Sequence, residues 1–315
     1  MLTHQISGVM YLARALVGCV GATMGFGDAD KFGDCATGFS MSDAAHAARM
    51  VKELKSGGID TSKIEVDDDQ EDPAVEAGSI AEKQLLELME GLLVDEASKA
   101  APFAVKLMCL RGRKYEVERA AELLPNFLAL CTEFGVDDEP GDQLKADALS
   151  GKMVMTGAVD PKGRPLFTLR LRNHKPKESK AIDMARLLSR VMVQALRKSV
   201  DAQRFGIVLL NDMSGVSVRN MDPAVPKLMF SSVFPRLPIR LARLCIFDPP
   251  FIIGRVVLPT VLFFMSKKLR ARLTAINGRD FKALHEVYPA TLLTADLGGT
   301  LAFDEAKFAK DVCGS

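Results

Sequence analysis

A row of basic side chains directly follows the most apolar stretch of the chain. The apolar stretch covers residues 251–265, and the basic side chains after it are Lys267, Lys268, Arg270 and Arg272. Ammonium and guanidinium groups bind phosphate oxygens, whereas an apolar surface takes up hydrocarbon. The two kinds of side chain next to each other therefore predict binding of an amphiphilic molecule or surface, which is the chemistry of a protein that handles lipid.

A membrane span and a buried core helix are the two alternatives for the apolar stretch. A membrane span needs about 20 largely apolar residues, whereas this stretch is shorter, contains Arg255 and Pro259, and follows two prolines. A buried core helix stays open, but the apolar side chains cover nearly the whole circumference instead of one stripe. A helix of this kind is either fully buried or faces an apolar partner outside its own core.

The patterns of the common catalytic sites are missing from the sequence. It has no G-x-S-x-G, H-E-x-x-H or G-x-x-x-x-G-K-[ST] pattern, and its histidines are scattered over positions 4, 46, 174 and 285. Asp212 and Ser214 follow a predicted strand, where a turn or a helix cap suits them better than catalysis. We therefore predict no enzyme, no catalytic residues, no metal site and no cofactor.

Composition places the chain among ordinary globular proteins. It has 315 residues, of which 48% are hydrophobic and 26% charged. The formal net charge is +1, which disfavours nucleic acid as a partner and means that attraction to an anionic membrane must come from local clusters. The 6 cysteines form no C-x-x-C pair, which favours a reducing, cytoplasmic setting. Residues 8–27 are apolar, but the interrupting Arg14 favours a helix or a loose extension over a secretory signal.

Hydrophobic periodicity divides the chain into four parts. Residues 1–78 are predicted to be an N-terminal extension with a solvated acidic linker at 65–72. Residues 79–136 show helical spacing and are expected to form a small all-helical domain. Residues 150–303 alternate strands with helices, which predicts an α/β fold with a small, mostly parallel sheet. Residues 304–315 are expected to be a short tail.

Within the α/β part, the predicted strands cover residues 165–172, 205–211, 243–247 and 273–276, with helices at 178–199, 223–234 and in the apolar stretch. Side chains alternate between the two faces of a strand. Phe167, Leu169 and Leu171 therefore share one face of the first strand, and Ile207 and Leu209 share one face of the next. Each of these residues suits either a core or the wall of a pocket.

Five short motifs follow one another in this part of the chain. They are residues 110–124 (LRGRKYEVERAAELL), 160–165 (DPKGRP), 210–217 (LNDMSGVS), 248–251 (DPPF) and 297–300 (LGGT). Together they resemble the signatures of the CRAL-TRIO lipid-binding family with its small N-terminal helical domain. The resemblance covers about residues 103–303. Each motif is weak alone, and the shared order and spacing carry the resemblance.

The resemblance implies that one sheet face and the surrounding helices enclose an apolar pocket for a single hydrophobic molecule. The apolar stretch would be a gate helix that opens at a membrane and contributes Phe251, Ile252, Val256 and Val257 to the pocket. Ile207 and Leu209 stand where phosphatidylcholine-binding members carry Ser and Thr. The resemblance therefore argues against phosphatidylcholine and leaves the identity of the lipid open.

Basic residues also enter through the resemblance. Arg113, Arg240, Lys268 and Arg272 fall at or near the positions where tocopherol- and retinaldehyde-type members bind phosphoinositide head groups. A solvated basic face is the alternative, since Lys and Arg are mostly exposed in any protein. Beside an apolar gate, however, each basic residue contributes about 1 kcal/mol of attraction to an anionic leaflet.

Two hypotheses follow from the sequence. The first is a cytoplasmic, peripherally membrane-associated protein that binds and transfers or presents a hydrophobic lipid without catalysis. Its expected partners are the lipid and an anionic membrane surface. The second is a lipid-sensing regulatory module that recruits a partner protein without bulk transfer. An enzyme acting on the bound lipid ranks below both, because the catalytic patterns are missing.

Overall fold

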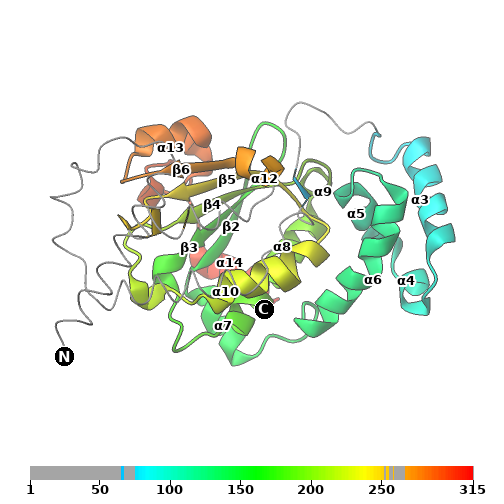
Figure 1. Cartoon of the computed structure of the whole chain (residues 1–315), viewed down its shortest axis with the longest axis horizontal. Helices are drawn as coiled ribbons and strands as arrows, with labels where there is room; N and C mark the ends of the chain where they lie inside the picture. Colours follow the sequence, from blue (N-terminus) through cyan, green and yellow to red (C-terminus); the bar gives the residue numbers. More distant parts are fainter. Residues whose placement is uncertain (1–64, 67–74, 252, 255–257, 259–266, 315) are drawn as a thin grey trace, which may run out of the picture.

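The computed structural model describes residues 65–66, 75–251, 253–254, 258 and 267–314, and a small helical unit opens the continuous part (Figure 1). This unit consists of α3 (Ile80–Leu92), α4 (Glu96–Ala100), α5 (Phe103–Gly112) and α6 (Val117–Glu133). Ser79 caps α3 by accepting a hydrogen bond from the amide of Glu82 at 3.1 Å, and Asp95 caps α4 in the same way. The predicted helical character of this part of the chain is confirmed.

A mixed sheet follows the helical unit, in the order β1-β5-β4-β3-β2, with β6 also paired to β5. Only β2 runs antiparallel to its neighbour among these described strands; the other pairs are parallel. The predicted α/β fold with a mostly parallel sheet is thus confirmed. The strands are β1 (Glu65–Val66), β2 (Met153–Val159), β3 (Pro165–Arg170), β4 (Ile207–Asp212), β5 (Arg240–Phe247) and β6 (Leu273–Ile276).

Helices cover both faces of this sheet. One face packs against α8 (Ala181–Lys198) and α10 (Ala224–Leu228), within the core that also includes the helical unit. The opposite face packs against α13 (Phe281–Val287) and the segment after it (Figure 1). Further elements include α7 (Asp142–Leu149), α9 (Val200–Phe205), the π-helical turn η4 (Met229–Val233), η5 (Phe234–Arg236) and α12 (Lys267–Ala271).

Several strand bounds differ from those expected. The strand predicted to reach residue 172 ends at Arg170, and Leu171–Asn173 form the 3-10 turn η2. Arg170, the last residue of the strand, forms ion pairs with Asp296 and Glu305. β2 was not expected, because Gly157, with φ of +80°, breaks its alternation. Glu65–Val66, expected in a solvated linker, pair in parallel with the start of β5.

The C-terminal residues extend the α/β part. Residues 304–315 were expected to be a short tail, and Glu305–Cys313 of this segment form α14. Asp304 caps the helix by accepting a hydrogen bond from the amide of Lys307 at 2.9 Å. Ala309 and Val312 are buried in the same core as α8. Arg190 and Gln194 of α8 donate hydrogen bonds to the carbonyl of Val312, which lies in the last turn of α14 and has no acceptor role within that helix.

Candidate functional site

The two faces of the sheet differ in how completely their apolar side chains are covered. On the α13 face, Leu166 and Val208 are each 1% exposed and Leu210 is 0% exposed. On the α8 and α10 face, Leu209 is 9% exposed, and three more leucines of that face are only half-buried: Leu169 in β3, and Leu241 and Leu244 in β5. Strands in the middle of a sheet normally bury such residues. The α8 and α10 face is therefore the incompletely covered apolar surface of the fold.

Four of the predicted pocket residues lie together on this face. The strand register pairs Phe167 with Leu209, and Leu169 lies two residues after Phe167 on the same face of β3. Ile207 lies two residues before Leu209 in β4 and therefore points to the same face. Phe167 is almost fully buried against α8, whereas Leu169 keeps accessible surface. Leu171 lies beyond the strand in η2, so the structure does not bring it into this row.

Residues that the sequence did not single out extend the same surface. Leu241 and Leu244 of β5 continue the face next to β4, and Val225 and Met229 face it from α10 and η4. Leu269 of α12 packs on Leu241 and Leu244. Leu241 and Leu244 do not follow simple alternation along β5. Ala242 is a bulge residue between Leu241 and Arg243, which pair with Ile207 and Val208, and it shifts the alternation by one residue.

The predicted gate region begins with an unusual backbone. Asp248, directly after β5, has φ of +50°, and its amide donates to the carbonyl of Ile276 at 2.8 Å. Asp tolerates this left-handed conformation better than most residues, so the chain turns sharply there. Ile253 and Leu258 are buried, whereas Phe251 is 52% exposed. Ile252, Val256, Val257 and most of the predicted gate helix lie outside the described residues.

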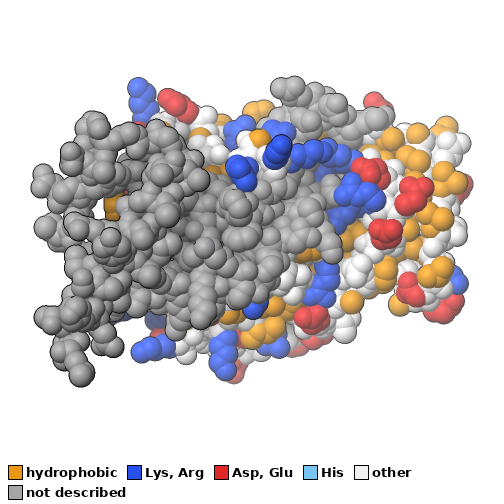
Figure 2. Space-filling model, viewed as in Figure 1, with side chains coloured by type: hydrophobic (Ala, Val, Ile, Leu, Met, Phe, Trp, Pro, Cys, Tyr) orange, Lys and Arg blue, Asp and Glu red, His pale blue; other side chains and the backbone are white. Residues whose placement is uncertain are grey.

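Two of the four predicted head-group residues lie at the surface. Lys268 is exposed on α12, and Arg272 directly after α12 is half-buried. The amide of Leu244 donates to the carbonyl of Arg272 at 2.9 Å, which fixes this segment beside β5. Lys267 and Arg270 are also exposed on α12, and Figure 2 shows Lys and Arg side chains gathered on this side of the molecule. The structure therefore places a basic surface next to the apolar face.

The other two predicted head-group residues are buried where the helical unit meets the sheet. Arg113 follows α5 and donates to the carbonyl of Pro235 at 3.3 Å, and Arg240 opens β5 and donates to the carbonyl of Gln203 at 3.5 Å. The backbones approach closely here: a Cβ atom on Gly112 would lie 2.6 Å from the carbonyl oxygen of Pro238. Both guanidinium groups thus lie near the start of β5, where they are buried. The basic side chains of α12 also lie beside β5, but they are exposed.

Comparison with known proteins identifies the α/β part. The family model of the CRAL/TRIO domain matches residues 149–299. These residues form a CRAL/TRIO domain. The match confirms the resemblance drawn from the motifs, and it spans β2 to the end of the segment after α13.

Two relatives align with this chain at 26% identity. The human tyrosine-protein phosphatase non-receptor type 9 aligns over 231 residues, which are 72% of this chain and 38% of that protein. The human alpha-tocopherol transfer protein-like aligns over 230 residues, which are 67% of this chain and 66% of that protein. The chain thus spans well under half of the phosphatase. A crystal structure of Sfh5 superposes with a TM-score of 0.44 at 12% identity, covering 76% of this chain and 98% of that one.

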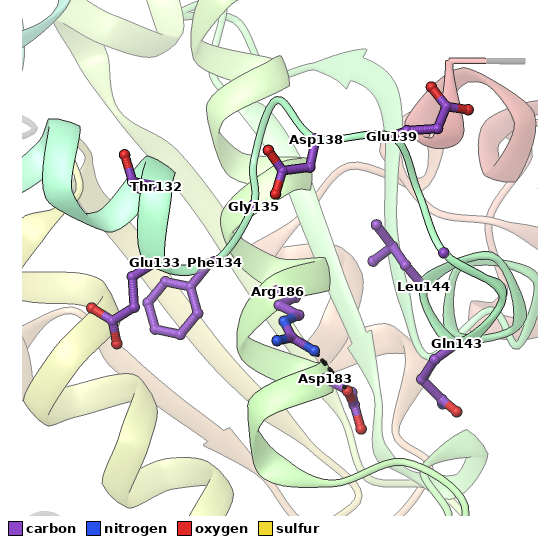
Figure 3. A pocket seen from close by; sticks show the side chains of 11 residues that line it. Thr132, Glu133, Phe134, Gly135, Asp138, Glu139, Gln143, Leu144, Asp183 and Arg186 are labelled. Carbon is purple, nitrogen blue, oxygen red and sulfur yellow. Dashed lines mark ion pairs between the residues drawn. The ribbon is translucent and has the colours of Figure 1, made fainter.

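A surface hollow of about 240 Å³ is lined by residues of helices and loops and by none from the described strands (Figure 3). It is bordered by the end of α6, the loop after it, the start of α7, and α8. Carboxylates of Glu133, Asp138 and Asp183 line it together with Arg186, which pairs with Asp183 at 3.5 Å. A charged wall of this kind gains nothing from hydrocarbon, so the hollow is a poor match for an apolar ligand.

Titratable groups of the CRAL/TRIO domain and its helical unit are adapted to burial. Burial raises the pKa of Cys131 to about 11 and that of Cys245 to about 12, so neither thiol is a thiolate nucleophile at neutral pH. Tyr288 donates to the carbonyl of Leu209 at 2.8 Å from the α13 side of the sheet, and burial raises the pKa of Tyr288 as well.

Throughout the described residues, no group of three His, Cys, Asp or Glu side chains could hold a metal ion. None of the described helices is long and apolar enough to cross a membrane.

Proposed function

We propose that this protein binds one hydrophobic lipid on the α8 and α10 face of its CRAL/TRIO sheet and delivers or presents it at anionic membranes without catalysis. The observation that carries the proposal is the contrast between the two sheet faces. Leu169, Leu241 and Leu244 are half-buried in the middle of the sheet, whereas the apolar side chains on the opposite face, such as Leu166, Val208 and Leu210, are fully buried. A ligand covering them gains about 0.8 kcal/mol for each buried methylene.

Support for membrane docking comes from the segment between β5 and β6. Phe251 is exposed at its start, and the basic residues of α12 are exposed at its end. An exposed aromatic ring inserts among lipid head groups, and exposed basic residues are attracted to anionic lipid. Ile252, Val256 and Val257 keep their proposed role on the pocket side of a gate, and Arg113, Arg240, Lys268 and Arg272 keep theirs in head-group binding.

A second candidate function is a lipid sensor that recruits a partner protein. The similarity to the tyrosine-protein phosphatase favours it, because the aligned region is only 38% of that protein and is therefore one part of a larger chain. A domain of this kind would report lipid occupancy instead of moving lipid. In this case the purified protein would bind lipid, but transfer between donor and acceptor vesicles would not exceed the spontaneous rate.

Native mass spectrometry of the full chain tests the first proposal. The wild-type protein should carry one bound lipid after incubation with vesicles of mixed natural lipids. Leu244→Gln should lower its occupancy about tenfold, because the amide loses hydrogen bonds to water when a lipid covers it. Leu88→Gln, at an exposed leucine of α3, is the matched control and should keep full occupancy.

The interpretation depends on both variants being folded, which circular dichroism and the thermal midpoint establish. A folded wild-type protein that never carries lipid would refute the proposal. Equal occupancy in folded Leu244→Gln and wild-type protein would show that the lipid lies elsewhere.

A further inference from the structure

One polar side chain interrupts the apolar α8 and α10 face. Asn211 lies two residues after Leu209 in β4, so both side chains point to the same face. The register places Asn211 between Leu169 of β3 and Ile246 of β5. Asn211 is thus surrounded by apolar neighbours at the carboxyl end of the central strand.

The carboxamide of Asn211 has an unsatisfied hydrogen-bonding group. Its Oδ1 atom is buried and has no hydrogen-bond partner within the described structure. Buried polar atoms without a partner are rare, because they lose water and gain nothing in exchange. An amide oxygen that accepts from a ligand would remove this cost, and it would do so at the end of the face where α/β sheets commonly bind ligands.

We propose that Asn211 accepts a hydrogen bond from a hydroxyl group of the bound lipid, which makes the preferred ligand a neutral long-chain or ring alcohol. This inference rests on the proposed lipid-binding function and names the class of lipid. A hydroxyl group both donates and accepts, so it matches either end of a carboxamide. The hydrocarbon part would then extend along Leu209 and Ile207.

The charges around Asn211 favour a neutral group over a phosphate. The next residue, Asp212, is buried and carries a carboxylate that pairs with Arg172. The buried Arg240 lies at the opposite, amino-terminal end of β5, next to Leu241, the partner of Ile207. Asn211 lies four residues after Ile207, which is about 13 Å along the strand at 3.3 Å per residue. Asp212 itself points to the opposite face of β4 and its charge is paired with Arg172. A phosphate at Asn211 would therefore be far from the Arg240 guanidinium and would lie among the apolar neighbours Leu169 and Ile246.

A pair of ligands that differ only in the donor tests the inference. The full chain is incubated with vesicles containing equal amounts of a C20 isoprenoid alcohol and its methyl ether, and the bound ratio is measured by mass spectrometry. The ether keeps the oxygen but cannot donate. The wild-type protein should favour the alcohol about tenfold, as expected for one hydrogen bond to an otherwise unsatisfied acceptor.

Variants assign this preference to one residue. Asn211→Leu should bind alcohol and ether in a ratio near one while keeping total occupancy, and Asn211→Ala serves if the leucine variant does not fold. Asn126→Leu, at an exposed asparagine of α6, is the matched control and should keep the wild-type ratio.

Three outcomes would overturn the inference. Wild-type protein that binds both ligands equally would refute the role of Asn211 and leave lipid binding intact. A preference that persists in folded Asn211→Leu or Asn211→Ala would place the acceptor elsewhere. Wild-type protein that binds neither these probes nor any natural lipid would refute the proposed function itself, and the inference with it.

Discussion

His174 is a buried histidine with no hydrogen bond to its ring in the described structure. It is 1% exposed, and both ring nitrogens are without a partner. Its charged neighbours are Lys152 directly before β2, Asp147 of α7 and Asp222 before α10. Lys152 is itself buried and bonded to Asp147 at 2.5 Å and to Ser179 at 2.9 Å. Burial first, and Lys152 second, lower the pKa of His174. The imidazole is therefore neutral in the folded protein at neutral pH.

This environment predicts a loss of stability in acid. Because the folded pKa lies below the ordinary value of about 6.5, the unfolded chain takes up the proton first as the pH falls. Between that value and the lower folded pKa, this group should decrease the free energy of unfolding by about 1 kcal/mol for each pH unit. His174→Leu should remove this slope in urea unfolding followed by circular dichroism. The two profiles should run parallel above pH 7.5, and an unchanged acid slope in the variant would exclude His174 as its source.

Single residues of the site were predictable only where strand alternation was regular. Phe167, Leu169, Ile207 and Leu209 follow simple alternation, and the structure places all four on one face. The bulge at Ala242 breaks the pattern of β5, so Leu241 and Leu244 were not predicted. Asn211 was missed for another reason: a polar residue near a strand end predicts a turn, and only the register shows that it faces apolar neighbours.

At the level of elements, a buried ion pair within the helical unit is linked by a hydrogen bond to the CRAL/TRIO domain. Arg111 of α5 donates to both carboxylate oxygens of Glu82 in α3, at 2.7 and 2.8 Å. It also donates to Gln203 of α9 at 2.8 Å, and Tyr115 donates to Glu82 at 3.1 Å. Burial alone would raise the pKa of Glu82, but the hydrogen bonds from Arg111 and from the amide of Gly78 outweigh it and lower that pKa. The pair holds three helices together.

Breaking this pair from one side should be costly. Arg111→Met leaves the carboxylate of Glu82 buried without its counter-ion, which should lower the free energy of unfolding by about 3–5 kcal/mol. Replacing both partners, as in Arg111→Met with Glu82→Leu, should recover most of the loss because no buried charge remains. Urea unfolding of both variants measures this difference. A double variant as unstable as the single one would mean that the bond to Gln203 matters more than the ion pair.

The elements themselves were partly legible in the sequence. Long periodic helices such as α6 and α8 were predicted because their apolar residues repeat with the helical period. β2 escaped prediction because Gly157 interrupts it, and its pairing with β3 is long-range information. α14 escaped because a short amphipathic helix is stabilised mainly by the core on which it packs, and here that core includes Ala309 and Val312.

For the whole molecule, the α/β fold was predictable because alternating strands and helices restrict the topology to few solutions. The net charge of +1 gives no general attraction to membranes. The proposed docking must therefore depend on where the basic residues lie, and the structure places exposed ones on α12 beside the incompletely covered apolar face. What the sequence could not supply is the separation of the basic residues into a surface pair, Lys268 and Arg272, and a buried pair, Arg113 and Arg240.

This separation leads to a prediction for membrane binding. Lys268→Ala with Arg272→Ala should weaken binding to vesicles containing phosphoinositide about tenfold, because each basic residue near the surface contributes about 1 kcal/mol and Arg272 is half-buried. High salt should abolish the difference from wild type, since exposed charges are screened. Lys282→Ala with Lys307→Ala, at exposed lysines of α13 and α14, is the charge-matched control. Both pairs should keep the wild-type thermal midpoint. Equal vesicle binding by wild type and both double variants would show that α12 is a solvated basic face with no part in docking.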